Sequence, residues 1–430
     1  MRGANESGPS TAIVPSVVGR ASLRIVAGFW LLAGAITAFG AFSIHQWGVV
    51  RPIYSGEFRA RPAVLEMWSR FDGSWYQQIA TDGYFYDKSR QSSIVFFPTY
   101  PLALKPWVEL GLNPYLAGFF LTLVATSVAV IVFMAWQRDF QFIGSLSGDA
   151  AFGTHDATQP SQLAINYSTL AWLAYPYAFF LYGSLYSDAL FAAVTITAFW
   201  LIERDRPILA GIVGIAATAA RPFGWAVTVG MAIRILERRW RQRHNQDLTI
   251  TTLIRHPFQA LSYVTARDLA VGLSGIGVVS WLSYLWIRFG SPKVFIWNEA
   301  FWGQGSDSSI LVKVVFWRSV SEWRTSPVTA ATLLAQAIIG LGLTTIGAWA
   351  VYRRFGLGLA TYVFLTIAPP LLFTKDFQGI GRYALSVFPC FAIIGLRLSP
   401  YKRFAPVVLA SSAFSMVILG SLFARGYYLS

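Results

Sequence analysis

A carboxylate set among aromatic residues is the first candidate for chemistry in this chain. Asp72 lies between Phe71 and Gly73 in a polar, acidic and aromatic stretch, residues 68–84. A carboxylate in a desolvated aromatic pocket can act as a general base. The Asp-Gly pair is also common in turns, so a turn or helix-capping role is the alternative. A short aromatic block, residues 96–101, closes the stretch.

Three cationic side chains are placed where they could hold a phosphate. Arg221 precedes Pro222 inside a hydrophobic stretch. Inserting an arginine at the centre of a membrane helix costs roughly 2.5–3.5 kcal/mol on insertion scales. Such an arginine is therefore usually ion-paired, reaches its head group toward the membrane surface, or has a function. Its guanidinium suits bidentate contact with a phosphate, although an interfacial arginine could equally contact lipid headgroups. Lys375 and Arg382 flank a short polar segment, and they too could bind a phosphate. The alternative for Lys375 is that Asp376 simply neutralises its charge.

A second carboxylate and several aromatic rings complete the candidate site. Asp188 opens a predicted hydrophobic helix, where a first-turn carboxylate meets the helix dipole favourably. Capping is therefore one interpretation of Asp188, and positioning a substrate hydroxyl is the other. Aromatic rings with polar tips could stack on a sugar and donate hydrogen bonds to it. The candidates for this contact are Trp75, Tyr76, Tyr84 and Tyr100.

The elements that must position these residues are membrane helices. Of the 430 residues, 55% are hydrophobic and only 13% are charged, against about 25% charged residues in an ordinary globular domain. Windows of about 20 apolar residues, long enough to cross a bilayer, recur along the chain. Because open sheets cannot satisfy their backbone groups in lipid, we predict an all-α polytopic membrane protein.

The apolar windows predict about 11 to 13 crossings. Residues 1–24 are expected to form a disordered cytoplasmic tail, because Arg20 and Arg24 precede the first span and basic flanks stay inside. Residues 25–430 then form one transmembrane domain with large outer loops over 45–95 and 288–327, and the first loop is expected to carry catalysis. The predicted spans are residues 25–44, 115–136, 165–183, 186–202, 269–287, 328–352, 357–373, 383–396 and 405–424, with a helical hairpin over 208–236 and a broken half-crossing over 96–111. This topology places Asp72, Tyr100, Asp188, Arg221, Lys375 and Arg382 at the outer face.

Several patterns exclude other classes of protein. The chain has a net charge of +14, and its basic residues cluster in short loops between the predicted spans. This distribution indicates anionic lipid headgroups rather than nucleic acid as the partner. The four histidines lack metal-ligand spacing, and the single Cys390 excludes an intrachain disulfide. No P-loop, dinucleotide fingerprint or soluble nucleotide-sugar domain is present. An activated substrate should therefore arrive through the bilayer. Asp72 could hold a divalent cation, but the sequence places no second carboxylate beside it.

Four sequence blocks in order resemble one known family. They are residues 68–84 with the core Asp-Gly-x-Trp-Tyr, Phe96-Phe-Pro-Thr-Tyr-Pro101, Tyr186-Ser-Asp-Ala-Leu-Phe191 and Ala220-Arg-Pro-Phe-Gly224. Their order and spacing resemble the PIG-V-like (GPI mannosyltransferase-like) family of the GT-C membrane glycosyltransferases. The resemblance covers about residues 25–235. Beyond that range it rests on Gly381-Arg-Tyr383 followed by Phe388-Pro389.

The resemblance implies a GT-C-type fold and a sugar-transfer reaction. Enzymes of this family take mannose from a dolichyl or polyprenyl phosphate, invert the anomeric centre, and carry their acidic catalytic residue in the first outer loop, here Asp72. A glycolipid or glycan acceptor and membrane lipids are the expected partners. Donor phosphate binding is expected at Arg221, Arg382 and Lys375, and substrate binding at Gly73, Trp75, Tyr76, Tyr84, Tyr100, Asp188 and Tyr383.

Three departures from the family pattern bear on specificity. This chain has Phe71 where Trp is commoner, Phe223 where Asn is commoner, and Asp188 where Glu is commoner. The acceptor and the sugar therefore stay open, with glucose or an aminosugar as alternatives to mannose. The expected location is the inner membrane of a bacterium or the endoplasmic reticulum of a eukaryote.

A transporter or lipid flippase is the alternative from another class of protein. In that case Arg221 and Asp188 would line the transport pathway. The sequence has no internal repeat of the kind that many transporters show, and its long acidic and aromatic outer loop favours the enzyme.

Overall fold

A computed structural model of the chain describes residues 19–50, 63–140, 160–302, 327–374 and 377–429. Within these ranges helix is the only regular secondary structure, so the all-α prediction is confirmed. The predicted phosphate ligand Lys375 and its neighbour Asp376 lie outside the described residues.

The helices fall into a long set and a short set. The long helices are α1 (Arg20–Trp47), α4 (Pro114–Asp139), α5 (Gln162–Leu173), α6 (Asp188–Glu203), α7 (Pro207–Thr218), α8 (Trp225–His244), α11 (Ile276–Phe289), α14 (Pro327–Gly342), α16 (Leu357–Phe373), α18 (Phe388–Leu398) and α19 (Ala405–Ala424). The short ones are η1 (Ala63–Ser69), α2 (Asp72–Asp82), η2 (Ser93–Val95), α3 (Thr99–Glu109), η4 (Ala178–Leu181), α9 (Ile250–Arg255), α10 (Pro257–Ser262), η5 (Asp268–Gly275), α12 (Val294–Glu299), η6 (Ala300–Trp302), η8 (Leu343–Gly347), α15 (Ala348–Phe355), α17 (Ile380–Tyr383) and η9 (Ala384–Ser386).

The described residues contain five helical stretches that are long and apolar enough to cross a membrane alone. They are Arg20–Trp47, Pro114–Asp139, Asp268–Phe289, Ala330–Phe355 and Ala405–Ala424. A sixth is the pair Ile380–Ser386 and Phe388–Leu398, which is bent by 78°, if the pair forms one span. These helices support an integral membrane protein. The count of 11 to 13 crossings and the GT-C type stay predictions.

Prolines explain why several predicted spans are shorter than expected. The span predicted over 165–183 ends as a helix at Leu173, before Pro176, because proline has no N–H to continue the hydrogen-bond ladder. The span predicted over 383–396 bends sharply just before Pro389. The hairpin predicted over 208–236 is confirmed as two contacting helices, α7 and α8, separated by a turn.

The first helix begins earlier than the sequence predicts. Residues 20–24 already form the first turn of α1 rather than an irregular segment. The side chain of Ser22 accepts a hydrogen bond from the Gly19 amide and donates one to the Gly19 carbonyl, so it stabilises this helix end. Residues 1–18 lie outside the described part of the chain.

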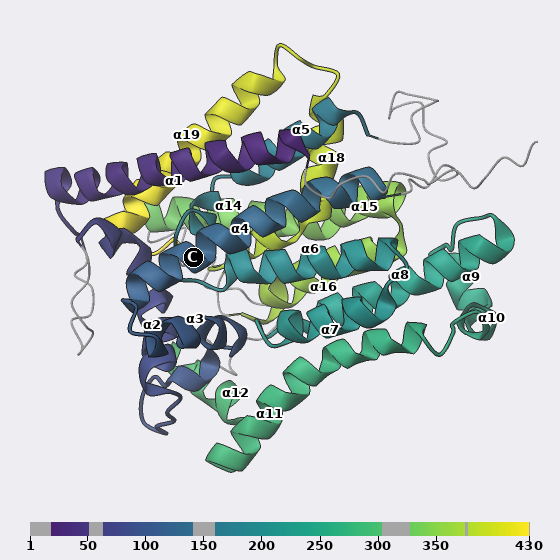
Figure 1. Ribbon diagram of the computed structural model, residues 1–430, viewed down its shortest axis with the longest axis horizontal. Helices are drawn as coiled ribbons and strands as arrows, with labels where there is room; N and C mark the ends of the chain where they lie inside the picture. Colours follow the sequence, from purple (N-terminus) through teal and green to yellow (C-terminus); the bar gives the residue numbers. More distant parts are fainter. Residues whose placement is uncertain (1–18, 51–62, 141–159, 303–326, 375–376, 430) are drawn as a thin grey trace, which may run out of the picture.

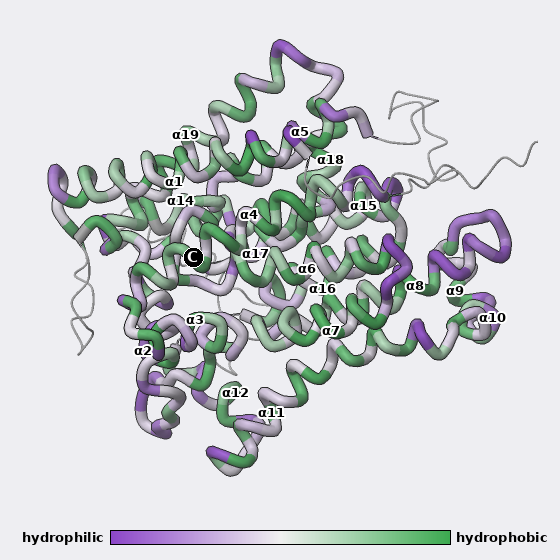
Figure 2. The backbone as a smooth tube through the Cα atoms, in the orientation of Figure 1, coloured by the Kyte–Doolittle hydropathy of each residue, from purple (hydrophilic) through white to green (hydrophobic). Residues whose placement is uncertain are grey.

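The helices form a bundle with a different group of short helices at each end. In Figure 1 the helices α1, α4, α6, α8 and α11 run roughly along the long axis, with α2, α3 and α12 at one end and α9 and α10 at the other. Figure 2 shows hydrophobic residues along the bundle and hydrophilic residues gathered near α2 and around α8 to α10. The segment predicted to be the first outer loop contains the short helices η1, α2 and η2, and its place on the outer side stays a prediction.

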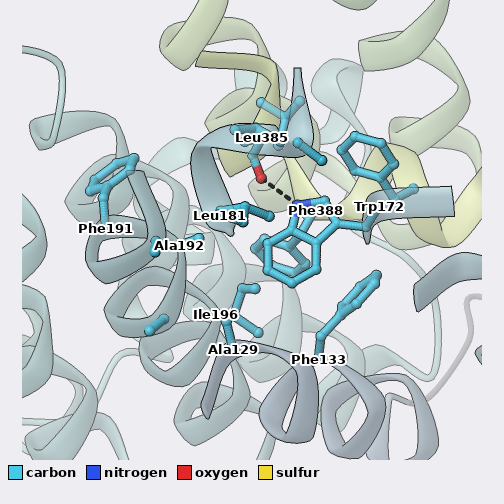
Figure 3. Packing of buried hydrophobic residues seen from close by; sticks show 14 of the residues in the cluster. Ala129, Phe133, Trp172, Leu181, Phe191, Ala192, Ile196, Leu385 and Phe388 are labelled. Atoms are coloured by element: carbon cyan, nitrogen blue, oxygen red, sulfur yellow. Dashed lines mark hydrogen bonds between the residues drawn. The ribbon is translucent and has the colours of Figure 1, made fainter. Parts of the chain in front are cut away.

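An aromatic core fixes the centre of the bundle (Figure 3). The ring of Phe133 on α4 lies 6.0 Å from those of Trp172 on α5 and Phe388 on α18. The Trp172 indole N–H donates to the Leu385 carbonyl at 2.8 Å, so the buried indole is satisfied. Phe191 on α6 belongs to the same core. The first turn of α6 is therefore held firmly, and this turn carries Asp188.

Candidate functional site

Asp72 is the first residue of α2, directly after a residue with unusual backbone geometry. Phe71 has φ 51° and ψ −116°, a conformation that costs on the order of 1–3 kcal/mol for a residue other than glycine and that gathers at functional sites. The Phe71 ring packs at 4.9 Å on Tyr428 and at 5.6 Å on Phe423, which holds the backbone in place. Asp72 lies in the first turn of α2, where a carboxylate meets the helix dipole favourably.

A tyrosine joins this turn to the start of α6. The Asp72 backbone N–H donates to the Tyr186 hydroxyl at 3.2 Å, and that hydroxyl donates to the Arg70 carbonyl at 3.0 Å. Tyr186 is fully buried. The loop that carries Asp72 is therefore attached to the helix that carries Asp188.

The Asp72 carboxylate is hydrogen-bonded to an arginine far away in the sequence. Arg382 Nη1 donates to Asp72 Oδ2 at 3.0 Å. The two side chains are 17% and 12% exposed, so the pair is mostly desolvated but reachable. Arg382 lies on α17, a short helix, rather than in the outer turn that the sequence predicts.

Asp188 lies behind this pair and bridges two arginines. One of its oxygens contacts Arg221 Nη2, and Oδ2 lies 3.8 Å from Arg382 Nε. The Asp188 and Arg221 side chains are 1% and 5% exposed. Arg221 is thus a buried ion-pair partner and does not match the alternative of a headgroup-contacting arginine. Asp188 also lies in the first turn of α6, where the notion of a carboxylate that meets the helix dipole still holds.

The ionic cluster of Asp72, Asp188, Arg221 and Arg382 is incompletely hydrogen-bonded. Both Asp188 oxygens and the Nε atoms of Arg221 and Arg382 are buried without a hydrogen-bond partner in the described part of the chain. Buried polar atoms of this kind are rare, and a ligand or water commonly completes them. Two positive and two negative charges also leave the cluster with no net charge.

Aromatic rings surround both arginines. The Arg382 guanidinium lies 4.9 Å from the Tyr186 ring and 5.7 Å from the Phe180 ring. Tyr383 contacts both cations, at 5.5 Å from Arg382 and 5.3 Å from Arg221. Ring faces attract cations, so these aromatic residues hold the guanidinium groups in position. Sequence reasoning named Tyr383 but not Tyr186 or Phe180.

The other predicted sugar-contacting tyrosines use their hydroxyls inside the protein. Tyr76 donates to Ser187 Oγ at 3.3 Å, Tyr84 to the Phe96 carbonyl at 2.9 Å, and Tyr100 to the Gly118 carbonyl at 3.3 Å. Burial raises the pKa of Tyr76 to about 12. These hydroxyls attach the first outer loop to the bundle, and a direct role in substrate binding stays a prediction.

Trp75 and Gly73 also contact the protein itself. The Trp75 ring is half-buried and lies 5.9 Å from Phe96 and 5.0 Å from Trp302. Gly73 is buried, and a Cβ on it would lie 3.3 Å from the Trp68 carbonyl oxygen. Gly73 is therefore required for close packing of α2 on η1.

A second carboxylate that sequence reasoning did not name ends the short helix α12. Glu299, the last residue of α12, is half-buried and experiences the negative charge of Asp72. Its sequence context, Trp297-Asn-Glu-Ala-Phe-Trp302, repeats the signal used for Asp72, a carboxylate among aromatic residues. This signal could have identified Glu299. Two carboxylates are too few for a protein-built metal centre, and no group of three or more potential metal ligands occurs in the described ranges.

No family model matches the chain, and no curated protein matches it.

Proposed function

We propose that this protein is an inverting glycosyltransferase that uses a polyprenyl phosphate sugar, with mannose as the favoured sugar. The observation that carries the proposal is the hydrogen bond between Asp72 and Arg382, joined through Asp188 to Arg221. The reaction needs a base for an acceptor hydroxyl and cations for a departing phosphate. Both kinds of group meet here, at one end of a bundle of apolar helices.

Arg382 is the better placed of the two arginines to contact the donor phosphate. Its side chain is 12% exposed, whereas Arg221 is 5% exposed and paired with Asp188. Cations that offset charge growing on the leaving phosphate act on the transition state and so accelerate the reaction. Arg221 then supports Arg382 through the shared Asp188. The Arg382 Nε atom makes no hydrogen bond in the described part of the chain, and a phosphate oxygen would accept one from it.

Asp72 would act on the acceptor. It takes the proton from the acceptor hydroxyl, whose oxygen attacks the anomeric carbon opposite the phosphate. The bond from that carbon to the phosphate oxygen breaks, and the polyprenyl phosphate leaves with the electron pair. Inversion at the anomeric carbon follows. A glycolipid or glycan is the proposed acceptor, and the predicted outer face is the proposed side.

Substitution of Asp72 tests this proposal. Purified protein is incubated with a panel of polyprenyl phosphate sugars, and products are identified by mass spectrometry. Asp72→Asn should lower turnover by about 10²- to 10⁴-fold, the usual contribution of a general base, and leave the protein folded. Asp82→Asn is the matched control, because Asp82 is exposed at the end of the same helix, and it should keep full turnover.

Two results would contradict the proposal. Normal turnover in Asp72→Asn would reject the role of Asp72. Transport of a labelled solute or lipid by proteoliposomes, with no glycosyl product from any donor, would favour a carrier or flippase instead.

A further inference from the structure

The short helices α9 and α10 carry large apolar side chains that the rest of the protein does not cover. Ile254 on α9 is 73% exposed and Phe258 on α10 is 85% exposed. Ile250 lies one turn before Ile254, and Leu261 lies one turn after Phe258, so each helix presents an apolar face. Both of these residues are also exposed. These four residues are the apolar set, and exposed clusters of this kind mark membrane or protein interaction sites.

The other side of the two helices is packed on α8. Ala260 on α10 is fully buried, and Leu253 on α9 is half-buried in the same cluster, which contains Trp240 of α8. The Tyr263 hydroxyl lies 3.1 Å from the ring nitrogen Nε2 of His244, at the end of α8. Figure 1 shows α9 and α10 beside this end of α8. Packing on α8 therefore fixes both helices, and the apolar set is left facing away from it.

Both helices lie next to the end of a candidate membrane span. Asp268 begins the stretch Asp268–Phe289, which is long and apolar enough to cross a membrane. Arg239 of α8 donates to Asp268 at 2.7 Å, so this part of α8 lies at the level of the end of the span. From Arg239, α8 continues only to His244, or about 7.5 Å at 1.5 Å per residue. The headgroup layer on each side of a bilayer is about 5–8 Å thick, so α9 and α10 follow α8 at headgroup level.

The charges of the same segment fit an anionic lipid surface. Residues 241–267 contain four arginines and one aspartate, and that aspartate, Asp247, is paired with Arg241. Arg243 and Arg255 are exposed and have no carboxylate within ion-pair distance in the described part of the chain. Exposed arginines beside apolar side chains are typical of helices that lie on anionic bilayers.

We propose that α9 and α10 form a docking surface for the anionic lipids of the adjacent leaflet. The apolar set enters the boundary between headgroups and acyl chains, and Arg243 and Arg255 contact lipid phosphates. Because the surface continues from the end of a candidate span, lipid reaches it without any further partner. The positive-inside rule places this end in the cytoplasm, where the leaflet is rich in anionic lipid. The inference does not depend on the proposed sugar transfer.

The first test measures where the apolar set lies in a bilayer. In the full chain Cys390, the only cysteine, is replaced by alanine, and a spin label is attached at Phe258→Cys or, independently, at Ile254→Cys. The protein is reconstituted into vesicles of equal parts phosphatidylcholine and phosphatidylglycerol. Collisions of the label with oxygen, which concentrates in lipid, should exceed collisions with a water-soluble nickel complex. Lys88→Cys, exposed in the first outer loop, is the control and should show the reverse.

The second test measures the preference for anionic lipid at the same place. A fluorophore at Phe258→Cys is quenched by nitroxide-labelled phosphatidylglycerol or phosphatidylcholine, each added in the same small amount. Phosphatidylglycerol should quench more strongly. Arg243→Gln combined with Arg255→Gln should lower the ratio of the two quenching constants by about 5-fold or more, since each basic side chain near an anionic surface contributes about 5-fold in affinity. Arg90→Gln, an exposed arginine of the first outer loop, should leave the ratio unchanged.

Three results would overturn the inference. Labels at residues 254 and 258 that collide mainly with the nickel complex would show that the apolar set lies in water. Equal quenching by the two lipids would show that anionic lipid is not preferred. Dipolar coupling between labels in singly labelled protein would assign the surface to a second copy of this chain instead. All three measurements stand whether or not the protein transfers sugars.

Discussion

At the scale of single residues, the site is a cluster of charges that share partners. Asp188 contacts two arginines, Arg382 contacts two carboxylates, and Tyr383 contacts both guanidinium groups. Because each charged side chain interacts with more than one other, the effects of single substitutions on turnover should not be additive. The sequence identified all five of these residues.

Substitution of Arg382 should affect chemistry more than folding. Arg382→Ala removes a cation that offsets charge on the leaving phosphate, and loss of one such donor typically lowers kcat by about 10²- to 10³-fold. Arg382→Lys should recover little of this loss, since lysine keeps the charge but lacks the planar fork. Single-turnover kinetics with the preferred donor measures both variants.

The control for Arg382 is a surface arginine. Arg90→Ala removes a side chain that is 71% exposed, and it should leave turnover unchanged. Equal turnover in Arg382→Ala and wild type would show that Arg382 does not act on the phosphate.

At the scale of elements, short helices attached to long ones place the reactive groups. The turn between α7 and α8 carries Arg221, and α17 carries Arg382. The sequence predicted the break at Arg221-Pro222 because proline interrupts helices locally. It could not predict that α12 packs on the loop before η2, since that contact joins Asn298 to residues more than 200 positions away.

At the scale of the whole molecule, the two ends of the bundle carry different ionic clusters. The end opposite Asp188 holds Arg234, 1% exposed, which bonds to Glu203 at 2.8 Å and to Glu237 at 3.3 Å. Asp188 and Glu203 are the first and last residues of α6, about 22 Å apart at 1.5 Å per residue. We therefore expect the Arg234 cluster to stabilise the fold, whereas the Asp188 cluster belongs to the candidate site.

Loss of Arg234 should destabilise the protein without slowing its chemistry. Arg234→Leu leaves the buried Glu237 without its cationic partner and leaves Glu203 with Arg238 alone, and breaking a buried ion pair costs on the order of 3–5 kcal/mol. A lower midpoint of thermal unfolding and a lower yield are expected, with unchanged kcat per folded molecule. Arg90→Leu is the control, because the Arg90 side chain is exposed, and it should alter neither quantity. A normal unfolding midpoint in Arg234→Leu would contradict a stabilising role.

The sequence alone determined the helical class, the membrane setting, the short helices of the first outer loop and the local setting of Asp72. These features depend on composition, apolar periodicity and proline positions, all of which are local properties. Only the tertiary structure decided that Asp72 meets Arg382, 310 positions later, and that Asp188 neutralises Arg221. Such pairs form when distant helices pack together, because the loss of water makes each buried charge require a partner.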